Sequence, residues 1–182
     1  MFSFLKGSTP PRRTIEAIYG MIVAQARQPV FYAQLAVPDT VNGRFDMVVL
    51  HLWMVLRRLR KADDGEQLAQ ATFDRFCDDM DDNLREMGVG DLTVPKRMQA
   101  FGEAFYGRTA AYDAALAAGG EALAIALNRN ILNEGDIENA RRLAVYVRAA
   151  TACLDEAEPP DFAIRQWPLP AGDSQGTWTA NE

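Results

Sequence analysis

The fold follows from residues 44–61, which read RFDMVVLHLWMVLRRLRK. Residues 47–56 are apolar except for His51, and four of the five residues after them are basic. A buried strand is the alternative for residues 47–52, but the length of the run favours a helix. A helix without a polar face is buried on every side, so we place this one in the middle of the domain.

The sequence on both sides of this central segment has helical periodicity. The segments with apolar residues at helical spacing are 12–28, 44–61, 66–87, 98–116, 121–132 and a last one that begins after Asp136 as N-cap. Pro29 ends the first segment, and Gly88 suits a left-handed cap at the end of the third. No strand pairs or hairpin turns occur. The sequence therefore predicts an all-α protein, a single compact domain of about six helices.

Proline content divides the chain into three parts. Four of the nine prolines fall between Pro159 and Pro170. We therefore expect a flexible N-terminal segment over 1–11, a helical domain over 12–157, and an extended, partly mobile Pro-rich tail over 158–182.

The charges are unevenly distributed along the chain. The net charge of -6 combines +6 in residues 1–61, where nine basic residues face three acidic ones, with -8 in residues 63–91, where two face ten, and -4 in residues 92–182, where eight face twelve. This pattern excludes a uniformly basic nucleic-acid-binding protein.

Cysteine usage and hydropathy indicate a compartment. Cys77 and Cys153 lie far apart and only one histidine is present, which excludes a disulfide scaffold and the usual zinc sites. No signal peptide and no apolar run of about 20 residues is recognisable. We therefore expect a cytoplasmic protein without a membrane span.

Two features could carry chemistry. The acidic cluster DDMDD at 78–82 could hold a divalent cation, but the EF-hand spacing is absent, so we favour a solvated or partner-facing surface. His51 could be a general base or a haem ligand, but its apolar neighbours favour a core histidine bonded to a polar group. No nucleophile motif or phosphate-binding loop is present. The sequence predicts no catalytic site and no cofactor.

The basic run at the end of the central helix has two interpretations. Arg57, Arg58, Arg60 and Lys61 could complement the helix dipole, or they could contact acidic lipid headgroups or an acidic partner. Lys6, Arg12 and Arg13 could extend the same surface.

Three blocks of sequence together resemble one family. They read QARQPVFY and VPDTVNGRFD at 25–32 and 37–46, FCDDMDDNLREMGVGD at 76–91, and VPK and EAFYGR at 94–96 and 103–108. In order and spacing they resemble the ubiquinol–cytochrome c chaperone family, over roughly residues 12–150. The tail after Ala157 lies outside the resemblance.

The resemblance implies a non-enzymatic assembly factor of the respiratory bc1 complex that engages newly made cytochrome b. Mitochondrial members work with a small partner subunit, near the ribosome at the inner membrane. The missing transit peptide fits a bacterial relative that is peripheral to the inner membrane on its cytoplasmic face.

The charge pattern and the resemblance together predict contact residues. A chaperone needs surfaces, and the acidic helix could meet the basic cytoplasmic loops of its client. The predicted contacts are Asp78, Asp81, Asp82, Arg85, Asp91, Tyr106, Arg108, Arg57, Arg58 and Arg60. The alternative is a helical protein that binds a lipophilic ligand such as haem, quinone or lipid between its helices.

Overall fold

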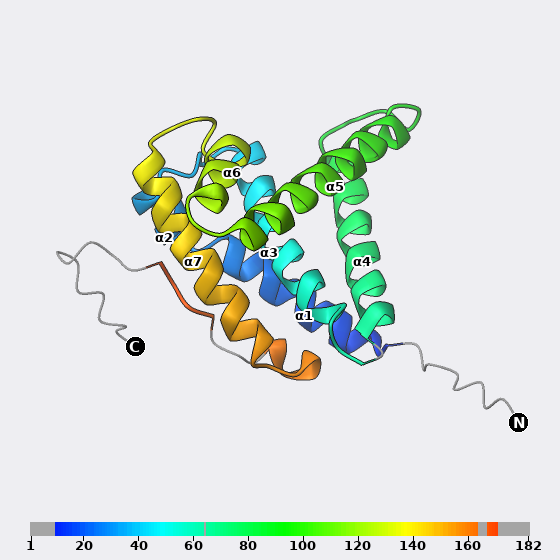
Figure 1. Ribbon diagram of the computed structural model, residues 1–182. Helices are drawn as coiled ribbons and strands as arrows, with labels where there is room; N and C mark the ends of the chain where they lie inside the picture. The colour runs from blue at the N-terminus through cyan, green and yellow to red at the C-terminus, as the bar shows by residue number, and fades with distance from the viewer. Residues whose placement is uncertain (1–9, 64, 164–166, 171–182) are drawn as a thin grey trace, which may run out of the picture.

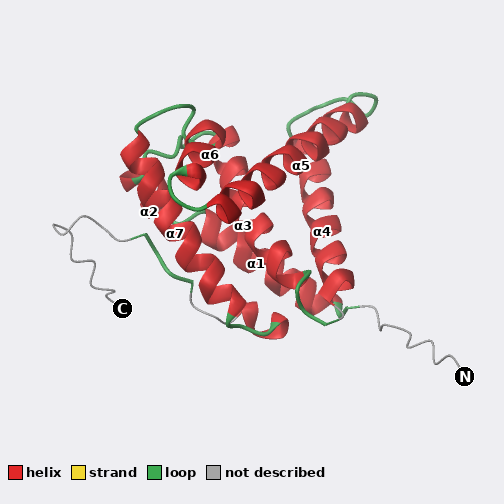
Figure 2. Cartoon of the chain, viewed as in Figure 1, coloured by secondary structure: helices red, strands yellow, loops and turns green. Residues whose placement is uncertain are grey.

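The computed structural model describes residues 10–63, 65–163 and 167–170, and all regular structure in these ranges is helical (Figure 2). The elements are α1 (Arg12–Ala26), α2 (Pro29–Gln34), α3 (Val41–Leu59), α4 (Gly65–Glu86), α5 (Val94–Ala118), α6 (Ala122–Asn130), α7 (Ile137–Asp155) and the 3-10 helix η1 (Pro159–Ala163). The predicted all-α class is confirmed. Lys6 and residues 171–182 lie outside the described ranges.

Helix α3 occupies the centre, as its apolar sequence predicts. Its buried residues run without interruption from Met47 to Leu56, and the helix contacts α1, α4, α5 and α7. It begins three residues earlier than expected because the Thr40 side chain accepts a hydrogen bond from the Gly43 backbone N–H at 3.1 Å. A Cβ at Gly43 would lie 2.0 Å from the Pro38 carbonyl oxygen, so only glycine fits there.

The first predicted helix is shorter than expected, and a second, short helix follows it. Helix α1 ends at Ala26, and Pro29 begins α2 instead of merely ending α1. Proline suits the first helical position because its missing N–H would have no partner there. This extra helix, which buries Phe31, accounts for seven α-helices in the described residues against the expected six.

The predicted helix ends of the second half agree with the structure. Gly88 has a φ of +79°, the left-handed conformation expected after α4. Asp136 caps α7 by accepting a hydrogen bond from the Glu138 backbone N–H at 3.0 Å. Helix α5 continues through Gly107 without a break.

Helices α4 and α5 form an arm that projects from the rest of the domain (Figure 1). Helix α4 packs on α1 and α3 at one end, and α5 packs on α6 at its far end. The two helices meet at the loop 87–93, which is the tip of the arm. We call α4, this loop and α5 the arm.

The described part of the Pro-rich tail corrects the expectation of an extended segment. Residues 159–163 form η1, which packs on α1, and Phe162 and Trp167 are buried in the core. The Gln25 side-chain amide donates a hydrogen bond to the Pro168 carbonyl at 3.1 Å. Residues 159–163 and 167–170 are therefore part of the domain, held by apolar burial and by a partly buried hydrogen bond.

The described helices lack a membrane span. None of them combines the length and the apolar character that crossing a bilayer requires.

Candidate functional site

The outer side of α4 carries a row of carboxylates, which we call the acidic face and define as Asp78, Asp81 and Asp82. Ala69, Phe76 and Leu84 lie on the opposite, buried side of the helix. Asp78 and Asp82 are exposed and form no ion pair with any residue described by the structure. Like charges four residues apart on a helix repel each other, so this arrangement costs helix stability. Asp78 and Asp82 are thus carboxylates that the fold does not require.

Asp79 lies in the same cluster but serves the fold. Its Oδ2 accepts a hydrogen bond from the Tyr19 hydroxyl at 2.8 Å, and Arg75 lies 3.7 Å from its Oδ1. Burial, together with the hydrogen bond to Asp79, raises the pKa of Tyr19. This contact joins α4 to α1. In residues 10–63, 65–163 and 167–170, this cluster included, no three His, Cys, Asp or Glu side chains are placed to hold a metal ion.

Arg85 connects the acidic face to the tip of the arm. Its guanidinium lies 2.6 Å from an Asp81 oxygen and 2.5 Å from an Asp91 oxygen. All three side chains are at the surface, so these pairs add little stability. They fix the loop 87–93 against the end of α4.

Tyr106 and Arg108 lie on α5 but in different surroundings. Tyr106 is 59% exposed, and its ring lies against Phe73 and Phe105. The Arg108 guanidinium lies 2.7 Å from an Asp46 oxygen and is mostly covered. Tyr106 is therefore available to a partner, whereas Arg108 joins α5 to α3.

The basic run at the end of α3 also divides into inner and outer residues. Arg58 is 8% exposed and donates hydrogen bonds to the Leu154 and Ala157 carbonyls at 3.1 and 2.7 Å. Arg57 is mostly covered and lies 3.6 Å from Asp155. Arg60 is exposed. Arg58 is thus a structural residue and not a surface contact, because its donors satisfy carbonyls at the end of α7.

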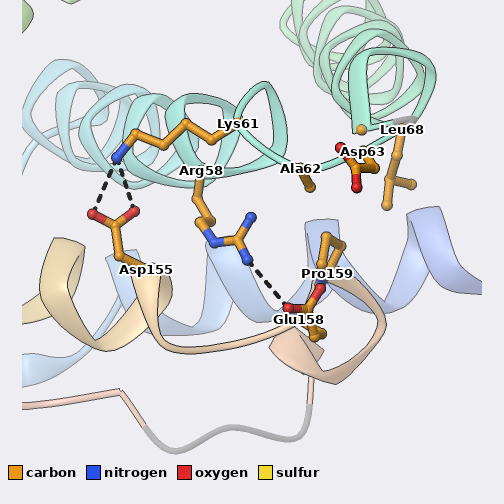
Figure 3. A pocket seen from close by; sticks show the side chains of 9 residues that line it. Arg58, Lys61, Ala62, Asp63, Leu68, Asp155, Glu158 and Pro159 are labelled. Carbon is orange, nitrogen blue, oxygen red and sulfur yellow. Dashed lines mark hydrogen bonds and ion pairs between the residues drawn. The ribbon is translucent and has the colours of Figure 1, made fainter.

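An open cleft of about 780 Å³ lies beside Arg58. Its lining residues are Arg58, Lys61, Ala62, Asp63, Gly65, Leu68, Asp155, Glu158 and Pro159. Figure 3 shows Lys61 directed at Asp155, with Nζ–Oδ1 at 3.1 Å, and Arg58 directed at Glu158, at 3.8 Å. Four of the charged groups of this cleft are thus paired with each other, Lys61 with Asp155 and Arg58 with Glu158.

Arg58→Ala is expected to lower the free energy of unfolding by about 3 kcal/mol, because buried carbonyls lose charged donors and the arginine stem leaves the core. Arg60→Ala is the matched control from the same basic run and should stay within about 0.5 kcal/mol of the parent protein. Urea unfolding followed by circular dichroism measures both. Equal effects of the two substitutions would contradict the structural role of Arg58.

His51 is fully buried in a chain of hydrogen bonds that has one consistent direction. Its Nδ1 lies 2.7 Å from the Met47 carbonyl, which can only accept, so Nδ1 carries the proton. Its Nε2 then accepts from the Tyr146 hydroxyl at 2.6 Å, and the Tyr146 oxygen accepts from the Gln25 amide at 3.2 Å. The predicted core histidine bonded to a polar neighbour is confirmed.

The surroundings of His51 do not fit a haem ligand. Both ring nitrogens are hydrogen-bonded, and the rings of Phe31, Tyr146 and Trp167 lie 5.4, 5.7 and 5.6 Å from the imidazole. The space that a lipophilic group would need beside this histidine is filled by aromatic side chains.

The titration of His51 and Asp46 predicts opposite effects of pH on stability. Burial lowers the pKa of His51 to about 4, so the unfolded chain takes up this proton first, and the contribution of His51 to the free energy of unfolding is lost as the pH falls from about 6.5 to 4. Burial raises the pKa of Asp46 to about 6, although the neighbouring Arg108 lowers it in part. The free energy of unfolding therefore rises as the pH falls from about 6 to 4 and the folded protein takes up this proton. Each amounts to about 3 kcal/mol, and the two nearly cancel.

Asp46→Asn removes one side of this balance. The variant should lose about 3 kcal/mol of unfolding free energy between pH 6.5 and 4, where the parent protein changes far less. Urea unfolding at a series of pH values measures this, and Asp46→Asn/His51→Gln should restore a flat profile. A parent-like profile in the single variant would show that His51 does not titrate as its burial implies.

Two surface features, a second cleft and an exposed apolar tip, were not predicted from the sequence. A second cleft, of about 450 Å³, lies between α1, α2 and the start of α3, and Arg27, Pro29, Tyr32, Ala33, Asp39 and Arg44 line it. The Asp39–Arg44 pair lies at its edge, with a separation of 2.7 Å. The periodicity of residues 66–87 places Met87 on the apolar side of the helix, which is wrong, because Met87 and its neighbour Leu92 are exposed at the tip. Large apolar side chains next to a glycine-containing loop are the signal that indicates this.

Comparison with known proteins identifies the family. A family model described as ubiquinol-cytochrome C chaperone matches residues 33–169. The chain belongs to this family. The match begins later than the expected residue 12 and extends to residue 169, so it includes the packed part of the tail. The buried position of Trp167 agrees with that extent.

Members and relatives of the chaperone family are similar over most of the chain. The Cbp3 homolog from Brucella abortus, known from a crystal structure, is 43% identical with a TM-score of 0.75, and the alignment covers 83% of this chain and 85% of that one. Ubiquinol-cytochrome-c reductase complex assembly factor 1 of Xenopus laevis is 27% identical, covering 81% of this chain and 75% of the relative. The human factor of that name is 28% identical, and the alignment covers 74% of this chain and 46% of the relative.

Proposed function

We propose that this protein is a non-enzymatic assembly chaperone of the respiratory bc1 complex and that it binds newly made cytochrome b at the inner membrane surface. The observation that carries the proposal is the family match over residues 33–169. The relatives from Xenopus laevis and human are named as assembly factors of the ubiquinol-cytochrome c reductase complex.

The arm supplies a surface suited to such a client. The acidic face leaves two carboxylates, Asp78 and Asp82, without ion-pair partners among the described residues. Cytoplasmic loops of membrane proteins carry an excess of Lys and Arg, so they complement this surface in charge. Arg85 and Asp91 hold the loop beside it, and the half-exposed Tyr106 ring lies on the neighbouring helix. We propose these residues, rather than Arg58 and Arg108, as the client contacts.

The exposed basic residues at the end of α3 are proposed as weaker contacts than the acidic face. Arg60 lies at the surface, whereas the Arg57 guanidinium already has Asp113 and Asp155 within 4 Å. An exposed arginine near an anionic surface gains about 1 kcal/mol, which is enough to orient the protein but not to anchor it.

Affinity purification tests the proposal. Tagged protein, isolated from cells in which the bc1 complex is being synthesised, should co-purify with cytochrome b in greater amount than with the other bc1 subunits. An unrelated membrane protein with basic cytoplasmic loops is the control and should be absent. Recovery of cytochrome b at the level of that control would overturn the proposal.

A further inference from the structure

Large apolar side chains lie in solvent at the tip of the arm. Leu92 is 99% exposed and Met87 is 60% exposed. Both belong to the loop 87–93, which Figure 1 shows at the outer end of α4 and α5. Their exposure to water is unfavourable, and contact with an apolar surface would remove that cost. The tip is therefore suited to contact with a membrane or another molecule.

The loop is held in this conformation by its own backbone. The Val89 N–H donates to the Leu84 carbonyl at 3.0 Å, and the Thr93 N–H donates to the Gly90 carbonyl at 2.7 Å. Leu84 and Val94, on either side of the loop, are buried. The outward direction of Leu92 therefore results from a hydrogen-bonded turn between two buried residues, and not from local unfolding of the core.

Unpaired positive charge lies directly behind the apolar tip. Lys96 and Arg97 are exposed in the first turn of α5 and form no ion pair with residues in the described part of the chain. Basic residues at this end of a helix oppose its dipole, so the fold gains nothing from them. The carboxylate next to Leu92, that of Asp91, is paired with Arg85, which it shares with Asp81.

We propose that the tip of the arm binds the surface of an anionic lipid bilayer. Met87 and Leu92 enter the headgroup region, and Lys96 and Arg97 contact lipid phosphates. A bilayer fits a projecting tip better than an apolar peptide does, since neither cleft described above includes these residues. The inference rests on the proposed function: with the tip at the bilayer, the acidic face lies where basic loops of a membrane client emerge.

Vesicle sedimentation with the full chain tests this. The parent protein should sediment with vesicles of phosphatidylglycerol and phosphatidylcholine but not with pure phosphatidylcholine. Met87→Asp/Leu92→Asp should lower the partition coefficient at least about tenfold, because two apolar side chains no longer enter the interface. Lys96→Glu/Arg97→Glu should lower it to a similar degree on anionic vesicles. Ile125→Asp, at an α6 position that is also 60% exposed, is the matched control and should bind like the parent.

The outcomes separate this inference from the proposed function. The inference is overturned if the parent does not bind anionic vesicles, if the tip variants bind like the parent, or if Arg12→Glu/Arg13→Glu abolishes binding while the tip variants do not. It is also overturned, in favour of a protein contact, if the tip variants keep vesicle binding but lose cytochrome b. Tip-dependent vesicle binding without any recovery of cytochrome b would instead refute the proposed function alone.

Discussion

Changing Asp78, Asp81 and Asp82 to lysine together is expected to reduce the cytochrome b that co-purifies with the protein by about tenfold or more. The substitution replaces attraction to basic client loops by repulsion, and like charges brought together at an interface cost several kcal/mol. The triple change to asparagine should have an intermediate effect, because it removes attraction without adding repulsion. Quantitative co-purification at low and at physiological salt measures both variants, and the difference between them should shrink as salt rises.

Folding and surface charge can be controlled separately in this experiment. Asp78 and Asp82 are exposed and repel each other, and the surface pair of Asp81 with Arg85 adds little stability, so the lysine variant should unfold at a temperature close to that of the parent. Glu66→Lys/Glu134→Lys/Asp161→Lys changes the net charge equally at exposed positions outside the acidic face. An equal loss of cytochrome b in this control would mean that net charge, and not the acidic face, governs capture.

Trp167→Ala is expected to lower the free energy of unfolding by about 3 to 5 kcal/mol. The indole is 6% exposed, and its ring centre lies 5.6 Å from that of His51. Its removal leaves a cavity next to the hydrogen-bonded chain of Gln25, Tyr146 and His51. It also weakens the attachment of residues 167–170, which are otherwise held by the hydrogen bond from Gln25 to the Pro168 carbonyl. Circular dichroism during urea unfolding measures the change without relying on tryptophan fluorescence.

Trp167→Phe provides the matched comparison for this position. A phenylalanine keeps most of the buried apolar area, and the buried Trp167 N–H has no hydrogen-bond partner to lose among the described residues. This variant should therefore lose clearly less stability than Trp167→Ala. A loss below about 1 kcal/mol in Trp167→Ala would show that the tail is not part of the cooperative fold.

Helix periodicity and capping chemistry made most of the fold predictable. The apolar run of α3, the Asp136 cap and the left-handed Gly88 are local signals, and the structure agrees with each. The packed tail was not predictable in this way. Its prolines indicate only that a long helix is absent, whereas the contact of Trp167 with His51 joins residues more than a hundred positions apart.

The candidate site shows the same division between local and long-range information. The two-sided pattern of α4 is local, so the exposure of Asp78 and Asp82 followed from spacing alone. Composition could not separate Arg58 from Arg60. The two arginines differ in their position around the helix axis. Arg58 is seven positions, or two turns, from His51 and so lies on the same buried side of the helix. The partners of Arg58 come from the end of α7, which no local pattern indicates.

Deletion of the gene followed by assay of the bc1 complex tests the chaperone function most directly. The account predicts that the deletion strain has little assembled complex on haem-stained native gels and correspondingly low ubiquinol–cytochrome c reductase activity. The parent gene should restore both, and the Asp78→Lys/Asp81→Lys/Asp82→Lys variant should not. Intact, active bc1 complex in the deletion strain would contradict the account.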